Sequence, residues 1–184
     1  MGEPIIPLAP SCLTSCSKAF YSQARQENLS PGLDKNCRSF DSQEDFDQKS
    51  GTKLKTLIRL ISFFVQYGNA VDPVLDGKGT LCNDPSSLNT SDGSSVLVYC
   101  NWLRQVALIC SALRVNNLNS ESATSNDSVH VRNKTLMAFS LKKDRHGNPC
   151  NVLIISGVGT TGLNITTANV VIFAVCFFSH FDDV

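Results

Sequence analysis

Three closely spaced glycines, Gly157, Gly159 and Gly162, form the part of the chain best suited to contact a ligand. They follow the apolar, β-branched run from 152 to 155, which has the composition of a buried strand. Without a Cβ, a glycine backbone can come close to a ribose or a phosphate. We therefore expect a glycine loop at the end of a strand, with Gly159 and Gly162 as candidate nucleotide contacts. The alternative is that they only shape a tight turn.

The spacing of these glycines also matches a dinucleotide-binding turn, but their surroundings exclude that interpretation. Such a turn leads into a long helix whose amino end holds the pyrophosphate. Here residues 163–168 leave room for one short turn before a second β-branched run, 170–175. The segment predicts a strand, a glycine loop, a turn and a second strand. Asn164 either ties the loop to a neighbouring strand or belongs to the turn alone.

A second group with chemical potential is basic. The chain has a net charge of zero, with 16 basic and 16 acidic residues, but residues 129–149 carry five basic side chains against Asp144 alone. Clustered positive charge suits a phosphate backbone, and a solvated helix face with its loop is the alternative. The basic residues of this segment are Arg132, Lys134, Lys142, Lys143 and Arg145.

Hydrophobic periodicity predicts the helices and strands that would position these residues. The fold class that it predicts is α/β. Near-continuous apolar strands are typical of a parallel sheet covered on both faces. We expect helices at 53–68, 103–113 and 129–141, and strands at 96–100, 151–156 and 169–175. Thr52 is a candidate cap for the first helix, and Gly68 its end. The polar stretch 116–128 lacks strand character, so a strand there is expected to be missing or eroded.

Composition predicts a low-order tail over residues 1–49, a domain over 50–184 and a polar insertion at 66–95.

The eight cysteines include no Cys-x-x-Cys pair, so we expect no metal site and a reduced, intracellular compartment. The longest apolar run, 170–178, is too short to cross a membrane.

Gly162-Leu163-Asn164-Ile165, preceded by Val158 and Gly159, resembles motif V of Swi/Snf-type ATPases in helicase-like superfamily two. Thr160 stands where that motif has a second glycine, and Gly157 where a polar or basic residue is common. Three upstream stretches resemble the same family in the same order. They are Ser50 to Leu57, Val96 to Trp102, and the helix that carries Arg132, Leu136 and Phe139.

This resemblance implies a partial RecA-like lobe, the second of two, over residues 50–184. In the family, ATP and Mg²⁺ lie between the lobes, and a first lobe brings the phosphate-binding loop. Neither that loop nor the arginine helix that comes after motif V occurs in the sequence. We expect no catalytic residue here, no ATP hydrolysis by this chain alone, and either a gene fragment or a piece of a longer chain.

The resemblance further implies DNA as a partner, contacted through Ser156 and Thr160 together with Lys142, Lys143 and Arg145, and a nuclear location. The nucleotide would meet Gly159, Gly162 and Asn164. The alternative is a degenerate, non-enzymatic module that keeps the fold as a protein or nucleic-acid binding surface. Thr160, Gly157 and the expected loss of a strand at 116–128 favour that alternative.

Overall fold

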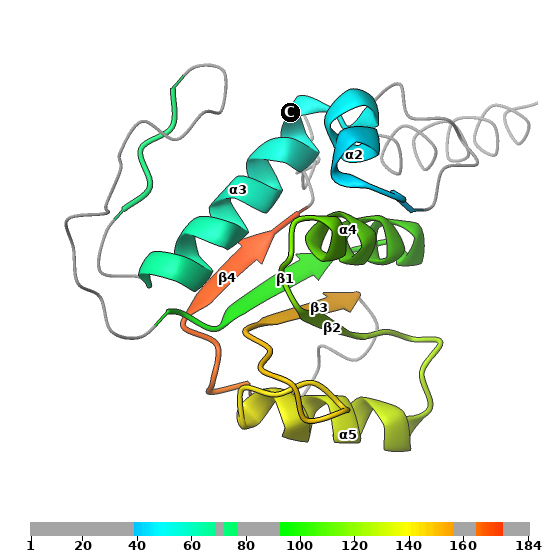
Figure 1. Cartoon of the computed structure of the whole chain (residues 1–184). Coiled ribbons are helices and arrows are strands. Elements are labelled where there is room, and N and C mark those ends of the chain that lie inside the picture. The colour runs from blue at the N-terminus through cyan, green and yellow to red at the C-terminus, as the bar shows by residue number, and fades with distance from the viewer. Residues whose placement is uncertain (1–38, 69–71, 77–92, 157–164, 175–184) are drawn as a thin grey trace, which may run out of the picture.

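The computed structural model describes residues 39–68, 72–76, 93–156 and 165–174. These residues form one parallel sheet between helices, as Figure 1 shows, which confirms the predicted α/β class. The helices are α2 (Gln43–Lys49), α3 (Thr52–Tyr67), α4 (Leu103–Val115) and α5 (Val129–Ser140). The strands are β1 (Val96–Cys100), β2 (Ser120–Ala123), β3 (Val152–Ser156) and β4 (Val170–Phe173).

The sheet has four strands in the order β2-β3-β1-β4, and every pair is parallel. Val96 of β1 stands opposite Val152 of β3 and Val170 of β4, while Ser120 of β2 stands opposite Val152. Because the strands run in one direction, all four carboxyl ends lie at the same edge of the sheet. That edge is where open α/β sheets bind ligands.

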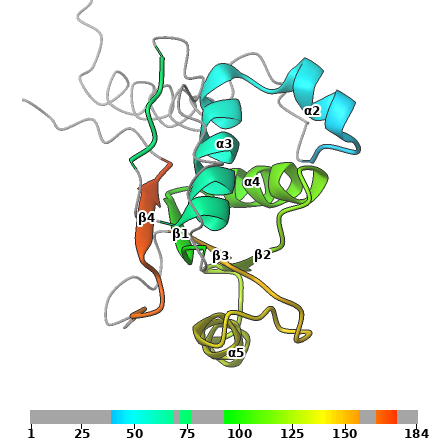
Figure 2. The same ribbon diagram turned by 60° about the vertical axis from the view of Figure 1, so that its left-hand side comes forward.

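Helices cover both faces of the sheet. On one face, Val98 and Ile154 belong to a buried core with Leu54 of α3 and Ile109 of α4. On the other, Phe139 of α5 is 1% exposed and packs with a smaller set of residues from β2 and β3, namely Ala123, Leu153 and Ile155. Figure 2 shows α5 on the opposite side of the sheet from α3 and α4. The purely apolar strands result from this double coverage.

Helix α3 ends where the sequence predicts, and the chain after the polar insertion is fixed against that end. Gly68 takes a φ of 72° and donates its N–H to Phe64 O at 3.0 Å. Ser94 N–H donates to the same oxygen at 3.0 Å. A Cβ on Gly93 would lie 1.8 Å from Val65 O. The expected cap Thr52 is instead the first helical residue, since Gly51 occupies the N-cap position.

The strand predicted to be missing or eroded in 116–128 is present as the four-residue β2, Ser120–Ala123, so the prediction of a missing strand was wrong. It pairs with β3 at one edge of the sheet. Glu121 is 5% exposed and its carboxylate is paired within the protein, which makes a charged residue compatible with a covered strand. Ser120 and Ser122 face the Cys110 thiol of α4. Small and paired polar side chains therefore replace the usual apolar pattern.

Residues 39–49 were assigned to the low-order tail, but they belong to the folded lobe. Phe40 is fully buried and stacks edge-on against Phe46 of α2, with ring centroids 5.2 Å apart. Phe40 N–H donates to Ser111 Oγ at 3.2 Å, and Arg114 Nη2 donates to Phe40 O at 3.1 Å. Two phenyl rings and two hydrogen bonds to α4 thus hold this stretch. Residues 1–38 lie outside the described ranges.

Candidate nucleotide and nucleic-acid site

The carboxyl edge of the sheet gathers the ends of β3 and β1. Strand β3 ends at Ser156, which pairs with Cys100 at the end of β1. The glycine segment comes directly after β3, and Asn101 and Trp102 come after β1 before α4 begins. The two stretches that carry the most specific sequence motifs therefore leave the sheet side by side.

The predicted nucleotide contacts Gly159, Gly162 and Asn164, and the predicted DNA contact Thr160, lie outside the described residues. Beyond them, the described chain resumes at Ile165, which packs against the α5 face of the sheet together with Ala168. Residues 165–169 form a turn and no helix. Asn169 N–H then donates to Ser95 O at 2.9 Å, beside the amino end of β1. This part of the segment agrees with the predicted turn before the last strand.

Ser156 is the one predicted DNA contact that is described at this edge. Its side chain shares the α3 and α4 side of the sheet with Val152 and Ile154, because alternate strand residues point to one face. Ser156 is 3% exposed, and its Oγ has no hydrogen-bond partner among the described residues. A buried hydroxyl without a partner is costly, so a donor or acceptor beside it is favoured.

The amino end of α4 lies at the same edge, on the side that Ser156 faces. Its N-cap residue is Trp102, whose side chain makes no capping hydrogen bond. The first N–H groups of a helix lack intrahelical partners and carry partial positive charge, which favours anions. This helix start was not predicted from the sequence as a contact. The sequence feature that could have indicated it is a strand followed by Asn101-Trp102, with no Ser, Thr or Asp at the cap position of the helix.

The predicted basic contacts Lys142, Lys143 and Arg145 lie at the opposite, amino edge. Helix α5 runs back from the end of β2 to the start of β3, so its carboxyl end reaches the amino edge. Cys150 N–H donates to Lys142 O at 2.9 Å, two residues before β3 begins. Lys142 and Lys143 N–H groups bond Phe139 and Ala138 carbonyls in the pattern of a Schellman motif, with Lys142 at a φ of 54°.

Arg145 is an ion-pair partner within the lobe. Its Nε lies 2.9 Å from Glu121 Oε2, and its backbone N–H donates to Glu121 Oε1 at 2.9 Å. The Glu121 side chain is 6% exposed and the Arg145 side chain 34%. The charge of Arg145 is thereby matched inside the protein, whereas Lys142 and Lys143 remain exposed. Of the four predicted DNA contacts that the structure describes, Ser156 therefore lies at one edge of the sheet and the three basic residues lie at the other.

The loop after α5 is held by the carboxylate of Asp144. It accepts from the N–H groups of His146 and Asn148 at 2.8 and 2.9 Å, and from the Asn148 and Asn119 side-chain amides at 2.8 and 3.2 Å. These donors, with the Asn148 amide first, hold the pKa of Asp144 well below its usual range. The loop is therefore a fixed structure that sets the positions of the lysines before it.

Arg132, Leu136 and Phe139 share the inner side of α5. Leu136 packs around buried Phe139, and Arg132 Nε is buried without a hydrogen-bond partner in the described ranges. The three residues whose spacing resembles the family helix therefore lie on the side of α5 that faces the sheet. Arg132 is the one cation among them.

The described cysteines are buried or half-buried thiols. Burial raises the pKa of Cys100 to about 12 and that of Cys110 to about 11, so neither is a ready nucleophile. In the described ranges, no group of three or more His, Cys, Asp or Glu side chains could hold a metal ion. Nor does any described helix have the length and apolarity needed to cross a membrane.

A model of the helicase conserved C-terminal domain matches residues 80–183, which includes the whole sheet, α4 and α5. The chain belongs to this family. No curated protein matches it significantly. The fold and the match identify a C-terminal lobe of the helicase-like superfamily two. Helices α2 and α3 precede the matched range, yet Phe46 and Leu54 share the core of this helicase C-terminal lobe.

Proposed function

We propose that this helicase C-terminal lobe is the second lobe of a Swi/Snf-type, DNA-dependent ATPase of the chromatin-remodelling kind, working in the nucleus. The observation that supports this best is the shared edge of the sheet. Ser156, after which the glycine segment begins, pairs with Cys100, and β1 leads from there to the start of α4, where the Trp102 side chain makes no capping hydrogen bond. A phosphate at this edge would meet backbone amides from a glycine loop and from a helix end.

In this proposal, ATP and Mg²⁺ bind between this lobe and a first lobe, present in cis or in trans. Gly159, Gly162 and Asn164 line the nucleotide from the second-lobe side. Phosphoryl transfer depends on cations and metal ions positioned around the transferred group. A first lobe supplies the phosphate-binding loop, so this chain alone binds nucleotide weakly and does not turn it over.

DNA contact is assigned to the carboxyl edge, through Thr160 and the start of α4, whereas the Ser156 side chain is 3% exposed and lies behind that surface. Neutral donors and helix ends often contact phosphate oxygens in protein–DNA complexes. Lys142 and Lys143 lie at the other edge, and Arg145 is paired with Glu121. The alternative of a degenerate binding module is weakened in one of its three reasons, since a strand, β2, is present in 116–128.

The DNA assignment is tested by adding negative charge at the proposed contact. Thr160→Glu places a carboxylate against the phosphate backbone and should weaken duplex binding by about tenfold or more, measured by fluorescence anisotropy at fixed salt. Thr166→Glu is the matched control, because Thr166 is exposed in the turn before β4. Equal affinity of the two variants for duplex DNA contradicts a DNA surface at the carboxyl edge.

The nucleotide assignment has a separate test. The chain alone should show no DNA-stimulated ATP hydrolysis above that of a Gly159→Val, Gly162→Val double variant. Hydrolysis that the double variant abolishes would show that this chain is a complete ATPase.

A further inference from the structure

The outward face of α5 carries an unusual amount of exposed apolar surface. Val129, Met137 and Leu141 are 65%, 70% and 71% exposed, more than any other large hydrophobic side chain in the described ranges. They are spaced by multiples of four residues, so they share one side of the helix. A helix that covers a sheet usually turns polar side chains outward. Thr135 and Phe139 already supply the inward contacts of α5.

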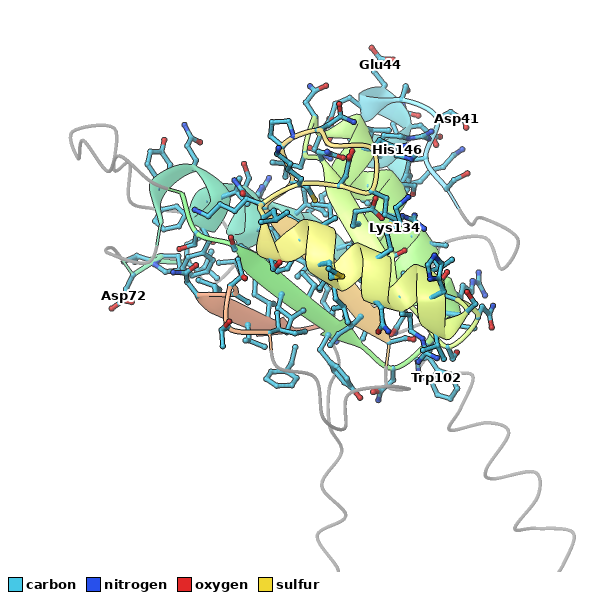
Figure 3. The ribbon with its side chains drawn as sticks, turned by 90° about the horizontal axis from the view of Figure 1, so that it is seen from below. Asp41, Glu44, Asp72, Trp102, Lys134 and His146 are labelled. Atoms are coloured by element: carbon cyan, nitrogen blue, oxygen red, sulfur yellow. The ribbon has the colours of Figure 1, made fainter. Side chains whose placement is uncertain are left out.

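The same face carries three lysine cations. Lys134 is exposed on α5, as is the His130 side chain, and Lys142 and Lys143 are exposed where the helix ends. The carboxylates next to α5 along the chain or in its following loop accept hydrogen bonds within the lobe: Asp127 from Thr124 and Asp144 from its own loop. Glu121 is paired with Arg145. Seen from below in Figure 3, α5 lies in front of the sheet with Lys134 on it, and no other described element covers it. The face therefore combines three apolar side chains with positive charge.

We propose that this α5 face, made of Val129, His130, Lys134, Met137, Leu141, Lys142 and Lys143, docks an acidic amphipathic segment of a partner protein. Its apolar side chains would lie on Met137 and Leu141, and its carboxylates would face Lys134, Lys142 and Lys143. The stripe from Val129 to Leu141 is about 18 Å long, which matches about three turns of a bound helix. Met137 adapts its shape to different apolar partners.

Charge and position favour this occupant over DNA. Exposed Met and Leu side chains contribute nothing to phosphate neutralisation, which needs cations alone. The lysine end of α5 also lies at the amino edge of the sheet, at the opposite end of β3 from Ser156. The docking face is thus separate from the proposed nucleotide and DNA edge, and it does not depend on that proposal.

The test uses the full chain and a labelled acidic amphipathic helical peptide of about four turns, with Leu at every fourth position and Glu on the remaining positions. Binding is measured by fluorescence anisotropy. A peptide with Lys in place of each Glu, and one with Ser in place of each Leu, serve as comparison probes. We expect only the acidic, Leu-bearing peptide to bind, and added salt to weaken it.

Two variants probe the two halves of the face. Met137→Ser with Leu141→Ser, and Lys142→Glu with Lys143→Glu, should each weaken peptide binding by about tenfold or more. Val171→Ser is the matched control, because Val171 is 49% exposed on β4, and it should leave binding unchanged. Circular dichroism of each variant confirms that the lobe is folded.

Three results would overturn the proposal. One is equal binding of the acidic and basic peptides. Another is binding of duplex DNA that the Lys142→Glu, Lys143→Glu variant loses and the Met137→Ser, Leu141→Ser variant keeps, with no peptide binding. The third is binding to phosphatidylserine vesicles, but not to the peptide, that both variants lose.

Discussion

Replacing Arg145 with alanine separates a structural role for this residue from a DNA-binding role. Its guanidinium Nε lies 2.9 Å from Glu121 Oε2 and 3.1 Å from Oε1. Arg145→Ala leaves the Glu121 carboxylate with the backbone N–H of residue 145 as its partner from this loop. The Glu121 side chain is 6% exposed, so water can replace the lost guanidinium only in part.

The expected loss of stability lies between two limits. Breaking a buried ion pair costs about 3–5 kcal/mol, and an exposed pair contributes at most about 1 kcal/mol. Because the Arg145 side chain is 34% exposed, we expect a loss of about 2 kcal/mol in the free energy of unfolding. For a domain of this size, that lowers Tm by about 4–8 °C. The slope of log affinity against log salt for duplex DNA should not change.

Urea denaturation followed by far-ultraviolet circular dichroism measures the first quantity, and DNA titrations at several salt concentrations measure the second. Lys143→Ala is the control, since Lys143 is exposed in the same loop, and it should change stability by less than about 0.5 kcal/mol. Replacing Glu121 and Arg145 together by Met should recover most of the loss. A stable Arg145→Ala variant whose salt slope flattens by about 0.9 would show that Arg145 contacts phosphate instead.

Three further predictions concern the lobe itself. Phe40→Ala should lower the free energy of unfolding by about 3–5 kcal/mol in urea titrations, because Phe40 is fully buried; a loss below about 1 kcal/mol would put residues 39–49 outside the cooperative unit. Gly93→Ala should lower Tm, since its Cβ would meet Val65 O; an unchanged Tm would mean that the chain shifts there freely. Asp144→Asn should lower Tm at neutral pH. Since the pKa of Asp144 is lowered on folding, its stabilisation is present above the ordinary carboxyl range and is lost as pH falls through the lowered value. The Tm difference between wild type and variant should therefore shrink in acid, and a difference independent of pH would contradict this account.

The elements predicted correctly from the sequence are those whose buried residues recur at the regular spacing of a helix or form a continuous apolar strand. Leu54, Leu57, Ile58 and Ile61 repeat along α3 and are all buried. Strand β3 is apolar at four successive positions because both of its faces are covered. Such patterns need no knowledge of the partner that covers them.

The missed elements depend on partners far along the chain. Glu121 belongs in a covered strand only because Arg145, 24 positions later, neutralises it. Phe40 is a core residue only because Ser111 and Arg114, 71 and 74 positions later, bond its backbone. A single sequence does not reveal which residues so far apart in the chain come into contact.

The candidate site shows the same limit. The motif at Ser156 and the cations at Lys142 and Lys143 are close in sequence, which suggested a single DNA surface. Strand β3 separates them, since the lysines precede its amino end and Ser156 is its last residue. Residues at the two ends of one strand face different edges of the sheet, however near they are in the chain.

The central position of β1 has a consequence for synthesis of the protein. Both of its neighbours come later in the chain, as the contacts from Cys100 to Ile155, 55 positions on, and from Ser95 to Asn169, 74 positions on, illustrate. At about 5–20 residues per second, the ribosome exposes β1 for several seconds before β3 and β4 exist. During that interval both hydrogen-bonding edges of the central strand β1 are without their partners. We expect nascent chains of this lobe to depend on chaperones until β4 emerges.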